Sequence, residues 1–156
     1  TPQELSDLLW AAFGINRPEE GKRTAPSAMN KQEIDRYVAK KDGLYRYDAE
    51  KNSLVQILDE DIRAATGEQD FVKDAPVNLV YVADYSKMGS LSQENKNLYS
   101  AADTGFISQN VYLYCASESL STVVRGSIDR KKLRKVMKLK ENQKIILAQT
   151  VGYPSD

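Results

Sequence analysis

One short segment, Val77 to Ala83, constrains the fold most, because it is nearly unbroken in apolar residues and begins directly after Pro76. Strands of this composition are typical of the interior of a sheet, where side chains on both faces are covered. We therefore expect a central strand here. The rest of the chain must supply its neighbouring strands and the helices that flank the sheet.

Alternation of apolar and polar residues predicts the other strands. A turn at residues 48–52 joins two of them into a hairpin, and the segment that follows the longest helix is also extended. The expected strands are residues 34–39, 43–47, 53–57, 121–127 and 144–151.

Four segments have the residue spacing of helices. Thr1 to Glu4 fits a capping box, apolar residues follow at helical spacing as far as Phe13, and Gly14 offers a C-terminal stop. Trp10 falls outside that apolar stripe, and it either widens the buried face or meets a partner. The other helices are expected at residues 59–65, 92–119 and 129–137, and the first and last of these begin at aspartate caps.

The helix at residues 92–119 is the longest expected element. Small residues such as Ala101, Gly105 and Ser108 sit between its apolar residues and allow close approach of another helix. The apolar residues expected to line most of one side are Leu98, Ala102, Phe106, Ile107, Val111, Leu113 and Tyr114. The order of all elements predicts an α+β fold with a mostly antiparallel sheet, and residues 1–156 are expected to form a single domain.

Composition limits the chemistry that side chains alone can perform. The absence of histidine excludes Ser-His-Asp and Cys-His triads, the usual zinc sites and the commonest general base. The single cysteine, Cys115, cannot form an internal disulfide, and we expect a buried, inert thiol. With 22 basic and 22 acidic residues, the formal charge is zero, so neither nucleic acid nor a membrane is expected as a partner.

Two charged clusters have structural explanations. Asp59, Glu60 and Asp61 are expected to open a helix rather than to hold a metal. The basic residues of Arg130–Lys138 are expected to form the solvated face of an amphipathic helix. No segment has the profile of a transmembrane helix or a signal peptide, and the chain has no initiator methionine, so the compartment is left open.

A polar segment from Asn16 to Gln32 is long for a connection, and such loops are usually functional or mobile. Within it, Gly21 to Asn30 is basic and rich in hydroxyl groups. Backbone N–H groups and Arg23 could hold a phosphate or another anion, while Ser27 and Asn30 offer hydrogen bonds to a planar heterocycle. The alternative is a solvated loop whose charges bind nothing.

Four ordered segments shift the balance toward a binding site. They are Gly21–Asn30, Asp103–Gly105 with Gln109–Leu113, Ser121–Asp129 and Val151–Pro154. Together they resemble the nitroreductase family of FMN-dependent oxidoreductases, and the resemblance extends from Leu5 to Pro154. It implies a nitroreductase-like fold in which helices flank the sheet, the long helix lies at a homodimer interface, and the flavin site lies between the subunits.

The resemblance also implies which residues bind FMN. The loop lies against the flavin, and the segment from Leu120 to Ser127 passes beside the isoalloxazine ring, where backbone N–H groups can stabilise negative charge. Because the flavin carries the chemistry, no side chain is expected to be catalytic and no metal is expected. The candidate cofactor-binding residues are Arg23, Thr24, Pro26, Ser27, Ala28, Asn30, Ser121, Thr122, Val123, Arg125 and Gly126.

The activity implied by the resemblance is a two-electron reduction of nitroaromatics, quinones or similar small acceptors, driven by NAD(P)H through a ping-pong mechanism. Two alternatives stay open. One is other flavin chemistry on the same fold, such as oxidation of azoline rings in modified peptides. The other is a degenerate module that only holds flavin or dimerises. The physiological acceptor and the choice between NADH and NADPH are not readable from the sequence.

The chain departs from the family pattern in three places. The Arg-x-Ser-x-Arg segment, which usually binds the FMN phosphate, does not precede Leu5, so we expect an N-terminally truncated domain. The family's Asn-x-Gln-Pro pattern with its following aromatic residue is replaced by Asn30-Lys31-Gln32-Glu33. The C-terminal arm that many members exchange between subunits is expected to be short or absent after Pro154.

Overall fold

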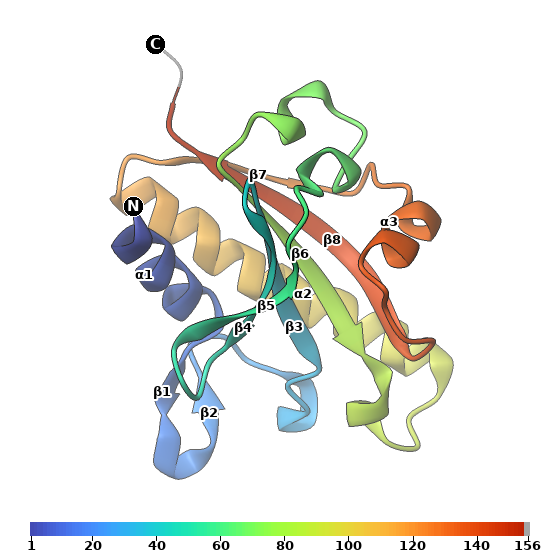
Figure 1. The fold of residues 1–156 in the computed structure, drawn as a ribbon. Coiled ribbons are helices and arrows are strands. Elements are labelled where there is room, and N and C mark those ends of the chain that lie inside the picture. The colour runs from blue at the N-terminus through green and yellow to red at the C-terminus, as the bar shows by residue number, and fades with distance from the viewer. Residues whose placement is uncertain (155–156) are drawn as a thin grey trace.

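The computed structural model describes residues 1–154, which form a six-stranded sheet covered on both faces (Figure 1). The order across the sheet is β5-β4-β3-β6-β8-β7, and every neighbouring pair is antiparallel. The strands are β3 Ile34–Lys40, β4 Gly43–Asp48, β5 Ser53–Leu58, β6 Val77–Asp84, β7 Ser121–Arg125 and β8 Gln143–Gly152. The predicted α+β fold with an antiparallel sheet is confirmed, and so is the hairpin of β4 and β5.

β6 is the central strand that its composition predicts. It pairs with β3 along one edge and with β8 along the other, and every residue from Leu79 to Ala83 is fully buried. Leu79 and Tyr81 belong to one apolar core, whereas Val80 and Val82 belong to a second core. Because a strand between two cores has no solvated face, its sequence is apolar without interruption.

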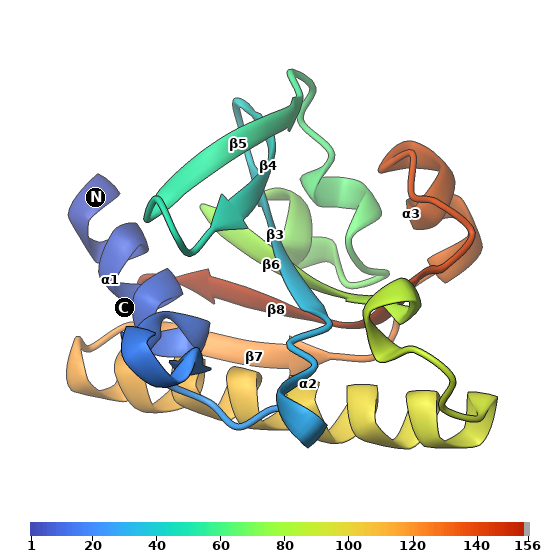
Figure 2. The ribbon, with the colours of Figure 1, turned by 90° about the horizontal axis from the view of Figure 1, so that it is seen from below.

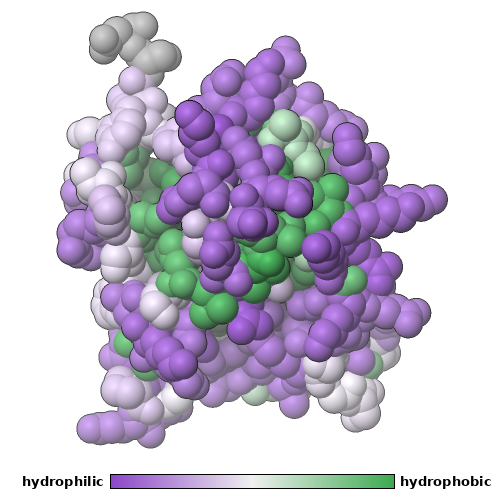
Figure 3. Space-filling view, viewed as in Figure 1, coloured by the Kyte–Doolittle hydropathy of each residue, from purple (hydrophilic) through white to green (hydrophobic). Residues whose placement is uncertain are grey.

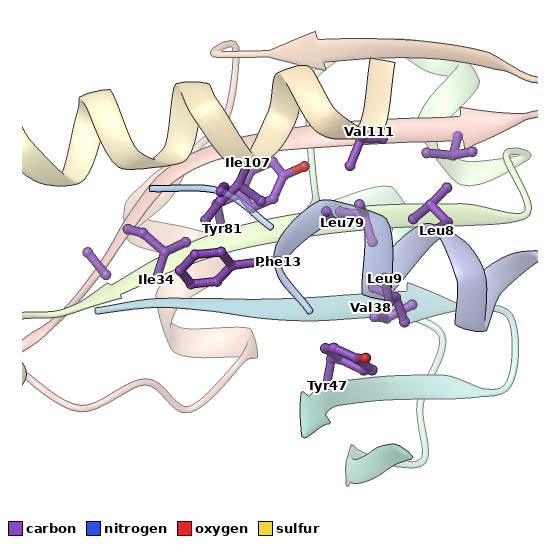
Figure 4. Packing of buried hydrophobic residues seen from close by; sticks show 14 of the residues in the cluster. Leu8, Leu9, Phe13, Ile34, Val38, Tyr47, Leu79, Tyr81, Ile107 and Val111 are labelled. Atoms are coloured by element: carbon purple, nitrogen blue, oxygen red, sulfur yellow. The ribbon is translucent and has the colours of Figure 1, made fainter. Parts of the chain in front are cut away.

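Helices α1 Pro2–Phe13 and α2 Gln93–Ser117 cover one face of the sheet (Figure 2). Leu9 and Phe13 of α1 and Ile107 and Val111 of α2 point toward the strands (Figure 4). The opposite face is covered by α3 Arg130–Val136 and by 3₁₀ turns. Since these elements are short, apolar surface remains visible at the centre of that face (Figure 3).

α1 begins and ends as predicted. The Thr1 hydroxyl accepts the Glu4 N–H at 3.2 Å, and the Glu4 carboxylate completes the capping box. Gly14 ends the helix by donating its N–H to the Trp10 carbonyl at 2.6 Å, and a Cβ at Gly14 would lie 2.5 Å from that oxygen. Trp10 is 45 % exposed, so it does not widen the buried face.

Two local predictions are wrong. Residues 59–65 do not form an α-helix, and only Arg63–Ala65 adopts a helical turn, which is a 3₁₀ helix. The Arg63 N–H donates to the Asp61 carboxylate and not to Asp59. The connection at residues 16–32 is not a plain loop, because β1 Ile15–Arg17 and β2 Lys22–Arg23 pair as a short antiparallel sheet. Elements of two or three residues are too short to show periodicity in a sequence.

The apolar residues of α2 divide between two sides, and not one as predicted. Ile107 and Val111 are buried, whereas Leu98, Phe106 and Leu113 are 60 %, 48 % and 62 % exposed. The buried side is completed by polar residues, namely Ser100, Asp103, Thr104 and Ser108. The helix therefore keeps an apolar stripe on its outer side. Within residues 1–154, no helix is long and apolar enough to cross a membrane.

Candidate functional site

The predicted cofactor loop is held in place by its own side chains. Arg23 donates from Nε to Gln32 Oε1 at 2.6 Å and from Nη1 to the Phe13 carbonyl at 3.1 Å. Gln32 Nε2 in turn donates to the Gly21 carbonyl at 2.6 Å and to Asn30 Oδ1 at 2.8 Å. The side chains of Arg23 and Asn30, both predicted to bind the cofactor, therefore also build the loop. Burial lowers the pKa of Arg23 from its usual value, which the guanidinium tolerates without losing its charge.

Backbone strain is concentrated in the same loop. Met29, Asn30 and Gln32 have φ angles of 51°, 53° and 50°, a region that residues other than glycine seldom adopt. Such strain costs about 1–3 kcal/mol per residue and collects at binding sites, where the surrounding structure holds it. Pro26 and Met29 are exposed at the tip. The loop thus presents a fixed, strained turn to its surroundings.

Beneath this turn lies a pair of buried carboxyl groups, of which Asp103 begins the Asp103–Gly105 segment and Glu33 lies outside all four segments. Asp103 Oδ2 accepts the Ala28 N–H at 2.9 Å. Ser27 Oγ lies 3.4 Å from Asp103 Oδ2 and 3.4 Å from Glu33 Oε2, and it accepts the Gln32 N–H at 2.7 Å. Glu33 and Asp103 are 0 % and 3 % exposed. Two candidate cofactor residues, Ser27 and Ala28, are therefore attached to α2 through this pair.

The sequence does carry signals for this pair. Glu33 stands where the family pattern has proline, and Asp103 is the only charged residue between Leu98 and Ser117. In the structure, burial and then the neighbouring Asp103 carboxyl raise the pKa of Glu33 above its usual value. A buried acid with a raised pKa is a feature that functional sites often share.

The second predicted segment, β7, is the last strand of the sheet. It pairs only with β8, so one row of its backbone N–H and C=O groups faces away from the sheet. Thr122 Oγ1 donates to the Thr150 carbonyl at 2.7 Å, and the Val124 N–H donates to the Tyr112 hydroxyl at 2.8 Å. Next to the strand lies a cleft of about 640 Å³, lined among others by Phe71, Pro76, Ser121, Val123 and Tyr153. Its volume suits a small molecule.

One candidate, Arg125, has a different role from the predicted one. Its side chain is 3 % exposed and donates to Thr150 Oγ1 at 2.9 Å, to the Thr66 carbonyl at 2.9 Å and to Asn78 Oδ1 at 3.1 Å. A Cβ at Gly67 would collide with this guanidinium at 1.8 Å. The Arg125 side chain is therefore an interior tie between segments, and the prediction that it binds the cofactor is corrected.

Gln69 is a candidate that the motifs miss. Its segment is fixed to the end of β7, because the Glu68 N–H donates to the Ser127 carbonyl at 3.1 Å and the Ser127 hydroxyl donates to the Glu68 carboxylate. Gln69 Oε1 is buried and has no hydrogen-bond partner within residues 1–154. Buried acceptors are nearly always paired, which makes this oxygen, beside Gly67, an exception in the described part of the chain. No sequence motif marks the residue.

The loop and β7 are hydrogen-bonded to α2 at different points along the helix. The loop is attached to α2 at Asp103 and β7 is attached at Tyr112, which places the two anchors about 14 Å apart along the helix axis at roughly 1.5 Å per residue. Among the hydrogen bonds of residues 1–154, none joins the two segments directly. Each chain therefore offers two separate half-sites.

Between the half-sites runs the outer stripe of α2, which carries no charge. Its exposed members are Leu98, Ala101, Ala102, Gly105, Phe106, Gln109, Leu113 and Ala116. Trp10, Thr24 and Leu113 line a shallow groove beside the stripe. A contiguous apolar surface of this kind marks an interaction site more often than a solvated face.

In the described part of the chain, the other titratable groups form neither a metal site nor a reactive thiol. Within residues 1–154, no group of three or more His, Cys, Asp and Glu residues is placed to hold a metal ion. Cys115 is buried as predicted, and burial raises the pKa of its thiol to about 11, so the thiol is protonated at neutral pH.

Known proteins are similar to this chain in sequence and in fold. The Nitroreductase family model matches residues 1–153. A protein of Methanocaldococcus jannaschii named "putative nitroreductase" is 34 % identical over 151 residues, which cover 90 % of this chain and 76 % of that protein. A crystal structure titled "putative nitroreductase" from Ralstonia eutropha has a TM-score of 0.93 at 45 % identity, covering 99 % of this chain and 73 % of its own.

A more distant structure, a "putative nitroreductase in complex with FMN" from Desulfovibrio desulfuricans, has a TM-score of 0.71 at 19 % identity and covers 100 % of this chain and 76 % of its own. At that identity, the likeness is one of fold. The family model and the nearer relatives go further, because they match the sequence over nearly its whole length. The chain belongs to the nitroreductase family.

Proposed function

We propose that the protein is an FMN-dependent oxidoreductase that uses NAD(P)H to reduce nitroaromatics, quinones or similar small acceptors by two electrons in a ping-pong reaction. Membership of the nitroreductase family supports an oxidoreductase, and a protein of the same fold binds FMN. The observation that carries the proposal is the preorganised loop, whose strained turn is held by Arg23 and Gln32. A loop that is already ordered loses little entropy when it binds a ligand.

The described atoms fit a flat, polar heterocycle. At the free edge of β7, the Val124 N–H already donates to Tyr112, so by the alternation of a strand Thr122 also presents its backbone groups there. Gly126 follows the strand, and Ser121 and Val123 line the cleft beside it. Gln69 Oε1 is an acceptor without a partner among residues 1–154. From the loop, Thr24 and Pro26 to Ala28 supply the opposing surface. FMN, when bound, supplies the group that accepts and delivers the hydride.

The arrangement of the half-sites supports a homodimer. Within one chain, the loop anchor at Asp103 and the β7 anchor at Tyr112 lie about 14 Å apart on α2, and a second copy packed on the outer stripe would add its own half-sites to this surface. A two-fold interface uses the same surface of both copies, and an uncharged helix stripe with small residues can pack against itself.

The cleft beside β7 suits a planar, apolar acceptor. Phe71 and Tyr153 are 46 % and 62 % exposed at its rim, and Val123 is 42 % exposed in its wall. Aromatic rims of this kind pack against flat rings and exclude water from them. No side chain of the chain is required to transfer a proton, which agrees with the absence of histidine.

An absorption spectrum of protein made from the complete reading frame and supplied with FMN tests this proposal. The expected result is a bound flavin spectrum that bleaches on addition of NAD(P)H and returns when a quinone or nitroaromatic is added. A colourless protein without NAD(P)H-dependent turnover would contradict it.

A matched pair of variants tests the half-site at β7. Gln69→Leu should weaken FMN binding about tenfold or more, because it removes a buried acceptor from a ligand donor. Gln56→Leu, an exposed position on β5, is the control and should bind FMN like the parent. Equal affinities for all three proteins would remove Gln69 from the site.

A further inference from the structure

The buried carboxyl pair under the loop, Glu33 and Asp103, forms no ion pair with any residue that the structure describes. Glu33 Oε1 is buried without a hydrogen-bond partner among residues 1–154. Two ionised carboxylates in one dry pocket repel each other and each lose their hydration, so the pair favours a state with a single charge.

The surroundings of the two acids indicate which of them is protonated. Asp103 Oδ2 accepts the Ala28 N–H at 2.9 Å, so this carboxyl oxygen acts toward the loop as an acceptor. The Glu33 carboxyl is less well supplied with hydrogen-bond donors: the Ser27 hydroxyl lies 3.4 Å from Oε2, and burial raises the pKa of Glu33 more than the nearby Ser100 hydroxyl lowers it. Burial and the adjacent Asp103 carboxyl both raise the pKa of Glu33. Glu33 is thus the acid that gains most from being neutral.

The groups around Glu33 do not supply a compensating charge. Asp103 faces it from α2, and Tyr85 faces it from the 3₁₀ turn Tyr85–Met88, where the phenol donates to Asn97. On its own strand, Arg36 donates to the Ile34 carbonyl and lies over the Phe13 ring at 5.0 Å. The Asp84 carboxylate accepts from Ser86 and Asn142.

We propose that a neutral Glu33 and the acceptor oxygen of Asp103 together position the Ser27–Ala28 turn of the cofactor loop, so that the position of this turn depends on the proton of Glu33. The link to the cofactor rests on the proposed function, whereas the positioning of the turn does not. When Glu33 loses its proton, its charge repels the Asp103 carboxyl and competes for the Ser27 hydroxyl. The bonds at Ala28 and Gln32 then loosen together.

Amide hydrogen exchange in the full chain without flavin tests the positioning directly. The rates at Ala28 and Gln32, each divided by the intrinsic rate at the same pH, should be lowest in mild acid. Above the pKa of Glu33, they should rise by up to about tenfold per pH unit, the limit set by one linked proton. Glu33→Gln keeps the shape without the charge and should hold both amides protected at every pH.

Two further variants complete the comparison. Asp103→Asn weakens the acceptor by replacing one carboxyl oxygen with an amide nitrogen, so the Ala28 amide should exchange about tenfold or more faster at every pH. Glu60→Gln, exposed and outside the pocket, should keep the parent profile. If Asp103→Asn does not fold, the proposal is tested by comparing the pH profiles of amide exchange in Glu33→Gln and Glu60→Gln. A Glu33→Gln profile that still follows pH, or that is unprotected in acid, overturns the proposal.

Titration of the same proteins with FMN, followed by flavin fluorescence, separates this proposal from the function it serves. The parent should bind FMN more weakly as the pH rises, whereas Glu33→Gln should bind it with a flat profile. If the exchange rates behave as expected but no variant binds FMN, the proposed function is contradicted and the positioning role of Glu33 stands. FMN binding that follows pH equally in the parent and in Glu33→Gln would overturn the role of Glu33 alone.

Discussion

The two sides of α2 show opposite relations between polarity and burial. The inner side buries Asp103 and Thr104 among apolar neighbours, while the outer side exposes Phe106 and Leu113 to the surroundings. In an ordinary surface helix, the apolar stripe faces the core and the polar side faces water. The inner side holds a polar loop as well as the core, and the exposed apolar outer side is the surface that we propose for a second chain.

The largest expected effect comes from the apolar part of the inner side. Ile107 is fully buried, so Ile107→Ala should lower the free energy of unfolding by about 2–5 kcal/mol through lost burial and the cavity that remains. Val55→Ala, 39 % exposed on β5, should cost less than about 1 kcal/mol. Denaturant melts of both variants measure the difference, and equal losses would contradict the assigned burial of the inner side.

The outer side should control association and leave the fold intact. Leu113→Glu places a charge in the proposed subunit contact, and it should weaken the dimer by about 2 kcal/mol or more, roughly thirtyfold in dissociation constant. Val55→Glu carries the same charge elsewhere and should leave the dimer unchanged. Sedimentation measures the association, and circular dichroism checks the fold. A dimer that withstands Leu113→Glu but not Val55→Glu would place the contact elsewhere.

The polar part of the inner side should make stability depend on pH. Because the folded protein raises the pKa of Glu33, its contribution is fully present below the ordinary value of 4.5 and is lost as the pH rises through the folded value. Over that window, the free energy of unfolding should fall by at most about 1.4 kcal/mol per pH unit. Melts of Glu33→Gln should show a shallower slope than melts of the parent, and parallel slopes would argue against a neutral Glu33.

The smallest expected effect is optical. Trp10 is the only tryptophan, is 45 % exposed and lies beside Leu113 in the groove next to the outer stripe. If the stripe is the subunit contact, the Trp10 emission should shift slightly to shorter wavelength as the protein is concentrated, because the indole loses contact with water. The Leu113→Glu variant should keep the longer wavelength at all concentrations. An emission maximum that never changes in the parent would place Trp10 outside the contact.

The sequence predicts those parts of the structure whose contacts are local, or whose residue pattern has a single structural explanation. The capping box at Thr1 needs only the next three residues, and the apolar run of β6 has no solvated alternative. The sequence does not reveal the burial of Arg125, because its partners Thr66, Asn78 and Thr150 come from three distant segments. A sequence shows the charge but not the interior acceptors that hold it.

The candidate site was predictable only in part for the same reason. The loop was found from its composition and motifs, but the bond from Ala28 to Asp103 joins residues 75 positions apart. The apolar residues of α2 were assigned to one side because the polar residues of the inner side break the usual pattern. Gln69 left no trace in any motif, and only its unpaired buried oxygen marks it.

The place of β6 in the sheet also has a consequence for biosynthesis. One edge of β6 is closed by β3, which precedes it in the chain, but the other edge is closed by β8, which follows only after residues 85–142. While the chain grows, the most apolar strand therefore has an open edge until α2, β7 and α3 have been made. Open apolar edges invite pairing with other chains, so aggregation during synthesis should be most sensitive to changes in β8.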